Sequence, residues 1–136
     1  MKKKTKKKTP TWYRKKCVAW AKNEAKKLVN HTCEHCGRRK ADGWQIHGSH
    51  IYPEGTYVSM SADVDNILAL CARCHTGGMW KNAKEPAWHT DPIYFGEWFK
   101  AKYPERYTKL KIRSQLVWVV NWEARYNEIK KNGDKI

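Results

Sequence analysis

Long hydrophobic runs are missing from this 136-residue sequence. No stretch approaches the roughly 18–20 consecutive apolar residues that a membrane-spanning helix needs. The lysine-rich beginning, MKKKTKKKTP, is also not followed by the apolar segment that marks a secretory signal peptide. The sequence therefore predicts a protein without a membrane partner that stays in the cytoplasm of the cell that makes it.

Acidic residues are scarce. The sequence has 13 Asp and Glu against 28 Lys and Arg, which gives a formal net charge of +15. A surplus of this size favours a polyanionic partner, and nucleic acid is the commonest one. Six lysines lie within residues 2–8, where they could serve solubility alone, but the positive charge continues along the chain. The candidate nucleic-acid contacts are Lys2, Lys3, Lys4, Lys6, Lys7, Lys8, Arg38, Arg39 and Lys81.

The sequence has five cysteines, and four of them form two C-x-x-C pairs, Cys33 with Cys36 and Cys71 with Cys74. In a cytoplasmic protein this pattern indicates a metal site and not disulfides. Each C-x-x-C turn can place two thiolates about 2.3 Å from one ion, so two turns complete a tetrahedral Zn²⁺ site of structural type. Cys17 lies on an apolar helical stripe, and we expect it to be buried and not a ligand.

Hydrophobic periodicity divides the chain into short segments. We expect a disordered basic arm over residues 1–10 and a single domain over residues 11–136. A helix should begin at Thr11 and end near Asn30, because apolar residues recur there at steps of three or four with lysines between them. Residues 44–51 alternate loosely between apolar and polar side chains, which predicts a strand.

The C-terminal part, residues 90–131, is predicted to be helical. Asp91-Pro92 and Pro104 each indicate a helix start, since proline fits the first turn of a helix. Apolar residues then step by three or four along one further segment, which predicts a final long helix. These residues are Ile112, Leu116, Val119, Trp122, Tyr126 and Ile129.

The segment between and around the cysteine pairs carries a specific pattern, with HGSHIYP after the first pair and DNILALCARCH leading through the second. Together with the cysteines, this pattern resembles the HNH nuclease family over about residues 33–82. The resemblance implies an α+β fold, in which a zinc-clamped ββα-metal core is wrapped by N- and C-terminal helices. It also implies a metal-dependent endonuclease that hydrolyses phosphodiester bonds in DNA.

The resemblance assigns a role to three polar residues. His50 would act as the general base that takes a proton from the attacking water. Asn66 would hold the long loop and orient the His50 ring through its side-chain amide. His75 would bind a catalytic divalent ion, which would be Mg²⁺, Mn²⁺ or another divalent metal.

The sequence departs from the family just before His50. Ser49 stands there, where family members usually have an Asp or His that ligates the metal. His47 lies on the same strand face as Ser49, and we expect it to replace that ligand of the catalytic ion. The other candidates are Glu54, Asp63, Asp65 and, at a greater distance along the chain, His89.

Several interpretations stay open on the sequence. A closer resemblance, to the phage NinG/Rap-type recombination endonucleases, rests on the cysteine pairs, the Gly-x-His strand end and the segment PIYFGEWFKAKYPERYTKL. It implies cleavage of branched DNA inside an infected cell. The main alternative is a non-catalytic, zinc-stabilised nucleic-acid-binding module, and a zinc ribbon acting as a protein adaptor is another. RNA stays open as a substrate, and the sequence does not indicate the oligomeric state.

Overall fold

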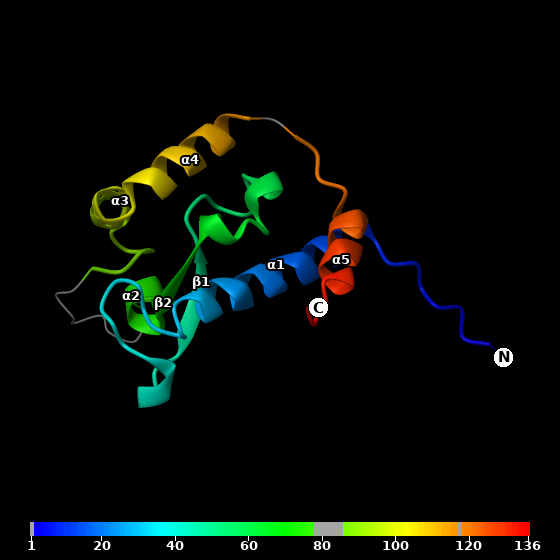
Figure 1. Ribbon diagram of the computed structural model, residues 1–136, viewed down its shortest axis with the longest axis horizontal. Helices are drawn as coiled ribbons and strands as arrows, with labels where there is room; N and C mark the ends of the chain where they lie inside the picture. The colour runs from blue at the N-terminus through cyan, green and yellow to red at the C-terminus, as the bar shows by residue number, and fades with distance from the viewer. Residues whose placement is uncertain (1, 78–85, 117) are drawn as a thin grey trace.

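A β-hairpin followed directly by a short helix forms the centre of the molecule (Figure 1). The computed structural model describes residues 2–77, 86–116 and 118–136. Strand β1 (Ile46–His50) pairs antiparallel with strand β2 (Ile67–Cys71), with His50 opposite Ile67 and Ile46 opposite Cys71. Helix α2 (Ala72–Thr76) begins at the next residue. The hairpin and α2 thus form a ββα unit, and the two ends of its intervening loop meet at His50 and Ile67.

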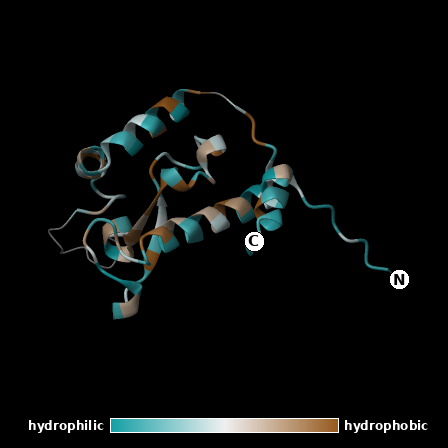
Figure 2. Cartoon of the chain, in the orientation of Figure 1, coloured by the Kyte–Doolittle hydropathy of each residue, from teal (hydrophilic) through white to brown (hydrophobic). Residues whose placement is uncertain are grey.

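Helix α1 (Pro10–Leu28) precedes the hairpin. Its N-terminus is capped by Thr9, whose side-chain oxygen accepts a hydrogen bond from the backbone of Trp12 at 3.2 Å, and Pro10 occupies the first turn. The predicted helix is therefore confirmed, although it begins one residue before Thr11. In Figure 2, α1 alternates between hydrophilic and hydrophobic residues, whereas the arm before it is almost uniformly hydrophilic.

The described residues of the C-terminal part contain three helices, α3 (Pro92–Lys102), α4 (Pro104–Gln115) and α5 (Trp122–Lys131). The prediction of one long final helix was wrong, because α4 ends at Gln115 and Asn121 caps a new helix by accepting a hydrogen bond from the backbone of Ala124 at 3.0 Å. The break lets α5 turn back and pack against α1 (Figure 1). Tertiary packing here overrides the helical period of the sequence.

Two apolar clusters lie on either side of the hairpin. One joins the hairpin to α3 and α4 and contains Phe95, Phe99, Leu110 and three of the C-x-x-C cysteines. The other joins α1 to α5 and contains Cys17, which is fully buried as predicted. The hairpin is therefore held between two helical layers, which confirms the α+β prediction of a ββα core wrapped by N- and C-terminal helices. None of the described helices is long and apolar enough to cross a membrane.

Candidate metal and histidine sites

The four paired cysteines meet at one point. The Sγ atoms of Cys33, Cys36, Cys71 and Cys74 all lie within 4.8 Å of one another. The first pair sits in a tight turn, in which the backbone nitrogen of Gly37 donates to the carbonyl oxygen of Cys33 at 3.0 Å, and the φ of +79° at Gly37 suits a residue without a side chain. The second pair lies at the junction of β2 and α2.

The environment of the cluster favours a bound ion. Cys33, Cys71 and Cys74 are buried, and only Cys36 is exposed. Hydrogen bonds from the Cys33 and Cys74 side chains lower the pKa of Cys71, whereas hydrogen bonds to Cys33 and Cys71 raise the pKa of Cys74. A bound cation would favour the thiolate form of all four sulfurs, which is the form that binds metal. Four thiolates in this arrangement fit a tetrahedral Zn²⁺ ion and leave no position for water. The predicted four-cysteine metal cluster is thus confirmed by its geometry.

The first C-x-x-C turn also carries contacts that sequence reasoning missed. The His35 ring lies between α3 and the cluster, with Nδ1 3.3 Å from Cys74 Sγ and Nε2 3.1 Å from the hydroxyl of Tyr94. The carboxylate of Glu34 accepts hydrogen bonds from the backbone of Ala69 at 2.7 Å and from the Tyr103 hydroxyl at 2.8 Å. These contacts attach the cysteine cluster to β2, α3 and the start of α4.

His50 is the last residue of β1, and its ring is half-buried. Its Nε2 atom lies 2.7 Å from the carbonyl oxygen of Ser61. A carbonyl oxygen only accepts, so Nε2 carries the proton and donates it. The neutral ring then has its unprotonated nitrogen at Nδ1, and Nδ1 is the atom that can accept a proton from a water.

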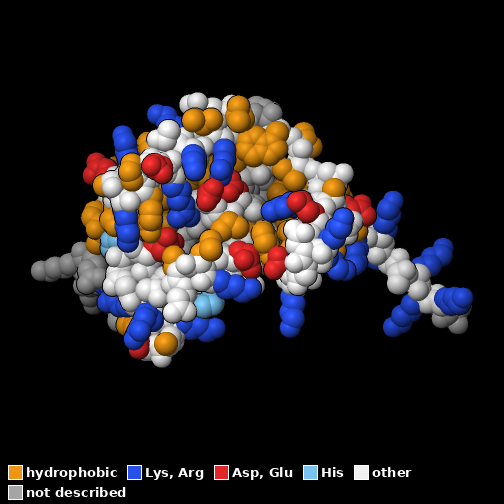
Figure 3. All heavy atoms as spheres, in the orientation of Figure 1, with side chains coloured by type: hydrophobic (Ala, Val, Ile, Leu, Met, Phe, Trp, Pro, Cys, Tyr) orange, Lys and Arg blue, Asp and Glu red, His pale blue; other side chains and the backbone are white. Residues whose placement is uncertain are grey.

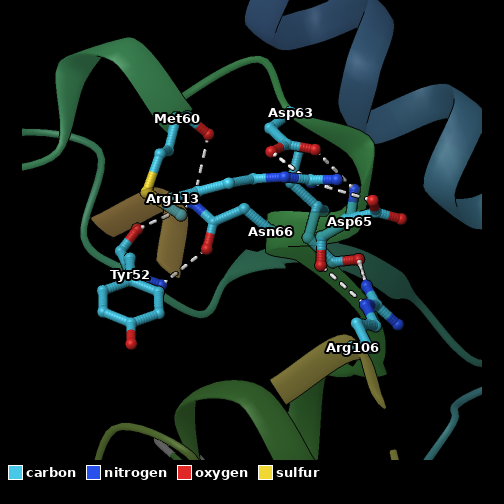
Figure 4. A network of polar contacts seen from close by, with 8 residues as sticks. Tyr52, Met60, Asp63, Asp65, Asn66, Arg106 and Arg113 are labelled. Atoms are coloured by element: carbon cyan, nitrogen blue, oxygen red, sulfur yellow. Dashed lines mark hydrogen bonds and ion pairs between the residues drawn. The ribbon is translucent and has the colours of Figure 1, made fainter. Parts of the chain in front are cut away.

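Asn66 is fully buried at the end of the loop that begins after His50 (Figure 4). Its Nδ2 atom donates to the carbonyl oxygens of Tyr52 and Met60, at 3.0 and 3.1 Å, and its Oδ1 accepts from the backbone of Tyr52 at 2.8 Å. Asn66 therefore holds the loop, as expected. Both amide protons are engaged in this way, so the expected direct contact with the His50 ring is corrected: the backbone of Ser61, adjacent to Met60, orients that ring.

Two arginines of α4 fasten the far end of the same loop. Arg113 donates to the carboxylates of Asp63 at 2.8 Å and Asp65 at 2.9 Å, and Arg106 donates to the backbone carbonyls of Asp65 and Ile67 (Figure 4). Asp63 and Asp65, which were candidate metal ligands, are thus ion-paired on the α4 side of the loop. A sequence contains no signal for this pairing, because the partners lie about fifty residues apart.

His47 and His75 come together across β1 and α2. Their Nδ1 atoms lie 2.9 Å apart, and their rings meet edge to face. Burial, together with the nearby charges of His89, His47, Lys22 and His50, lowers the pKa of His75 to about 4. Burial and the lysines Lys26 and Lys22 also lower the pKa of His47. Both rings are therefore neutral near pH 7, which is the form that binds a metal.

The histidine pair fits a divalent ion, because two neutral imidazole nitrogens converge there from two elements. Ser49 is 2 % exposed and pairs with Leu68 in the hairpin register. The position that usually carries the extra ligand is thus an almost wholly buried serine.

Lys22 of α1 is a further positive group beside this pair, although it is not among the predicted nucleic-acid contacts. Its side chain passes so close to β1 that a Cβ atom at Gly48 would lie 2.7 Å from Lys22 Cγ and 2.8 Å from Lys22 Cβ. Glycine at position 48 is what permits this approach. Lys22 thereby comes near enough to lower the pKa of both His47 and His75.

The predicted nucleic-acid contacts lie in two described regions, the N-terminal arm and the segment that contains Arg38 and Arg39. The lysines of residues 2–8 are exposed on the arm, and Figure 3 shows Lys and Arg side chains along this arm and along the edge of the molecule near α1. Arg39 forms an ion pair with Asp42 at 3.0 Å. Arg38 lies 4.7 Å from the centre of the Trp44 ring, and a hydrogen bond to Cys36 raises its pKa. Lys81 lies outside the described residues.

Comparison with known proteins identifies the core. Residues 33–77 match the model of the HNH endonuclease family, and these residues include both cysteine pairs, the hairpin and α2. This segment is an HNH endonuclease domain. The match spans His47, His50, Asn66 and His75, and it leaves α1, α3, α4 and α5 outside. None of the curated proteins or solved structures compared with the chain gives a significant match.

Proposed function

We propose that the protein is a metal-dependent endonuclease that hydrolyses phosphodiester bonds in DNA. The observation that carries the proposal is the placement of His50 in the HNH domain. Its ring is fixed by Ser61 with Nδ1 as the free basic nitrogen, at the end of the strand that also presents His47 to His75. A nuclease of this family needs one oriented base and one ion site. His50 would supply the base, and His47 and His75 would supply the ion site.

In the proposed reaction, Nδ1 of His50 takes a proton from a water molecule as its oxygen attacks the phosphorus. The new P–O bond forms while the bond between phosphorus and the 3′ oxygen breaks. The 3′ oxygen takes up a proton from solvent water, which leaves a 5′-phosphate and a 3′-hydroxyl. The donation from Nε2 to Ser61 persists through the step and stabilises the imidazolium that forms. His47 and His75 would hold the divalent ion, which when bound neutralises charge on the phosphate and on the leaving oxygen.

The charge around the site supports a polyanionic substrate. Lys22 and Lys26 of α1 lie close enough to His47 to depress its pKa, and the net charge of the chain is +15. Lysines placed in this way can neutralise the phosphates that flank the cleaved bond. We propose DNA as the substrate, and the resemblance to the NinG/Rap-type enzymes makes branched DNA of a phage the form to test first.

One observation favours a second function. Ser49 replaces the usual metal ligand and is buried, so the ion would depend on residues outside the usual pair. A domain that had lost its ion would still present the lysines and the zinc-stabilised hairpin to nucleic acid. The second candidate is therefore a non-catalytic nucleic-acid-binding module.

A cleavage assay separates the two functions. Plasmid DNA, a branched DNA junction and a single-stranded RNA would be incubated with wild type and with His50→Ala, with and without added Mn²⁺, Mg²⁺ or Ni²⁺. We expect His50→Ala to lose about 10²–10⁴-fold in cleavage rate, the typical contribution of general-base catalysis. Its DNA affinity and zinc content should equal those of wild type. Metal-dependent nicking that is the same in both proteins would contradict catalysis by this site.

A further inference from the structure

His89 lies fourteen residues after His75 in the sequence. In the fold, however, it packs against α2, the helix that contains His75. Its backbone nitrogen donates to the carbonyl oxygen of His75 at 3.1 Å, and the backbone nitrogen of Trp88 donates to the carbonyl oxygen of Cys74 at 2.7 Å. The turn is closed by Thr90, whose hydroxyl accepts from the backbone of Ala87 at 3.2 Å. His89 is thus attached to α2 by its backbone and lies outside the matched HNH segment.

The rings of three histidines therefore form a continuous row. The ring centres of His75 and His89 are 4.5 Å apart, and those of His47 and His75 are 5.1 Å apart. The three residues come from β1, from α2 and from the turn after it. His75 stands in the middle, where either neighbour can share an ion with it.

We propose that His47, His75 and His89 together bind one transition-metal ion of the Zn²⁺, Ni²⁺ or Co²⁺ class, with His89 as a ligand from outside the HNH segment. The proposal rests on the proposed function, since this ion is the one that would serve cleavage. It deepens that function by assigning a third ligand and the chemical class of the metal. Three protein ligands leave a fourth position open, as in catalytic zinc sites.

The donor set decides the class of metal. Three carboxylates of the neighbouring segments are engaged elsewhere, because Asp63 and Asp65 bind Arg113 and the Asp91 side chain caps α3 through the backbone of Tyr94. The row offers only imidazole nitrogens. Imidazole suits Zn²⁺, Ni²⁺ and related ions, whereas Mg²⁺ prefers oxygen ligands and keeps its waters. A preference for Ni²⁺ or Zn²⁺ over Mg²⁺ follows from these side chains.

Binding requires the rings to turn. Two nitrogens bound to one tetrahedral ion at about 2.0–2.1 Å lie about 3.4 Å apart, somewhat more than the 2.9 Å between His47 and His75. Among the described residues, only the four cysteines have every ligand atom within 4.8 Å of the others. The His47 and His89 rings must therefore turn toward a common point, while the backbone contacts of His89 to α2 can stay in place.

Calorimetry on the full-length protein with its cysteine site filled by zinc tests the inference. Ni²⁺ and, separately, Mg²⁺ would be titrated into wild type, His89→Ala and His75→Ala. His31→Asn is the matched control, since none of the described ring contacts joins His31 to the row and asparagine tolerates its φ of +50°. We expect one Ni²⁺ site with affinity well above that for Mg²⁺. Because even an outer-shell partner of a metal contributes about 10–100-fold to affinity, loss of His89 as a direct ligand should weaken Ni²⁺ binding at least tenfold.

A spectroscopic readout locates the ion. In ¹⁵N NMR spectra of the zinc-loaded protein, added Ni²⁺ should broaden the imidazole signals of His47, His75 and His89 and leave that of His31 sharp. Unchanged Ni²⁺ affinity in His89→Ala, or a sharp His89 signal with Ni²⁺ bound, overturns the inference. That result is distinct from a failure of the proposed function, which shows as absent DNA cleavage with the three-histidine ion in place.

Discussion

The Nε2 atom of His50 donates a hydrogen bond to the carbonyl oxygen of Ser61 across 2.7 Å. The backbone of the loop thereby selects the tautomer of the histidine and leaves Nδ1 free. Asn66 holds the carbonyl of Met60, one residue before Ser61, so it controls the same stretch of backbone without touching the ring. The loop therefore sets the orientation of the proposed base, so a substitution that destabilises the loop should also lower the cleavage rate.

Asn66→Ala should lower both stability and cleavage. The change removes the side-chain partner of a buried carbonyl of Met60 and of part-buried backbone groups of Tyr52, which costs about 1–3 kcal/mol. Urea unfolding measures the stability, and the NMR signal of the His50 ring reports its tautomer. Asn127→Ala, at an exposed position of α5, is the control and should stay within about 0.5 kcal/mol of wild type. A stable Asn66→Ala protein with an unshifted His50 signal would contradict this role of the loop.

Cys71→Ser should release the metal of the cysteine cluster. Wild type is expected to hold about one zinc per chain at this site, and removal of one of four thiolates opens a site on which the local fold depends. Metal analysis after dialysis and circular dichroism would measure the two effects. Cys17→Ala is the matched control, because Cys17 is equally buried but lies in the cluster between α1 and α5. It should keep its zinc, and zinc retained by Cys71→Ser would count against the four-thiolate site.

Lys22→Met should weaken DNA binding and make it less dependent on salt. Methionine keeps an unbranched apolar stem beside Gly48 and removes only the charge. Loss of one phosphate contact lowers the slope of log affinity against log salt by about 0.9. Lys109→Met, at an exposed position of α4, should leave that slope unchanged. In the same variant the pKa of His47 should rise, since the Lys22 charge lowers it in wild type. Equal slopes for Lys22→Met and wild type would remove Lys22 from the proposed interface.

The zinc-loaded protein, without a second ion, should lose stability as the pH falls from about 6.5 to about 4. Burial holds the pKa of His75 at about 4, against an ordinary value of 6.5, so the unfolded chain binds the additional proton across this window. Urea unfolding at pH 7 and pH 5 would measure the loss. His75→Asn should show a smaller loss, and His31→Asn should follow wild type. An identical pH dependence in all three proteins would show that His75 is not held neutral by burial.

Much of the candidate site could be predicted because its patterns are local. A C-x-x-C pair needs only one turn to place two thiolates, and the two pairs meet because β1 and β2 connect them. The α1 helix likewise follows from its own apolar period and from its cap at Thr9. The positions of His50, Asn66 and His75 could also be predicted from local sequence, since the strand, loop and helix of the HNH segment follow one another directly along the chain.

The amino-acid sequence by itself thus determined the metal cluster, the α+β class and the segment that contains the proposed base. Tertiary structure alone decided which partners the remaining polar groups have. Arg113 pairs with Asp63 and Asp65, and His89 lies against His75. The predicted last helix ends at Gln115, and α5 begins after its cap at Asn121 and packs on α1. These outcomes depend on contacts between segments that are distant in the sequence, and such contacts stabilise the protein only once the chain has folded. No local period or spacing encodes them.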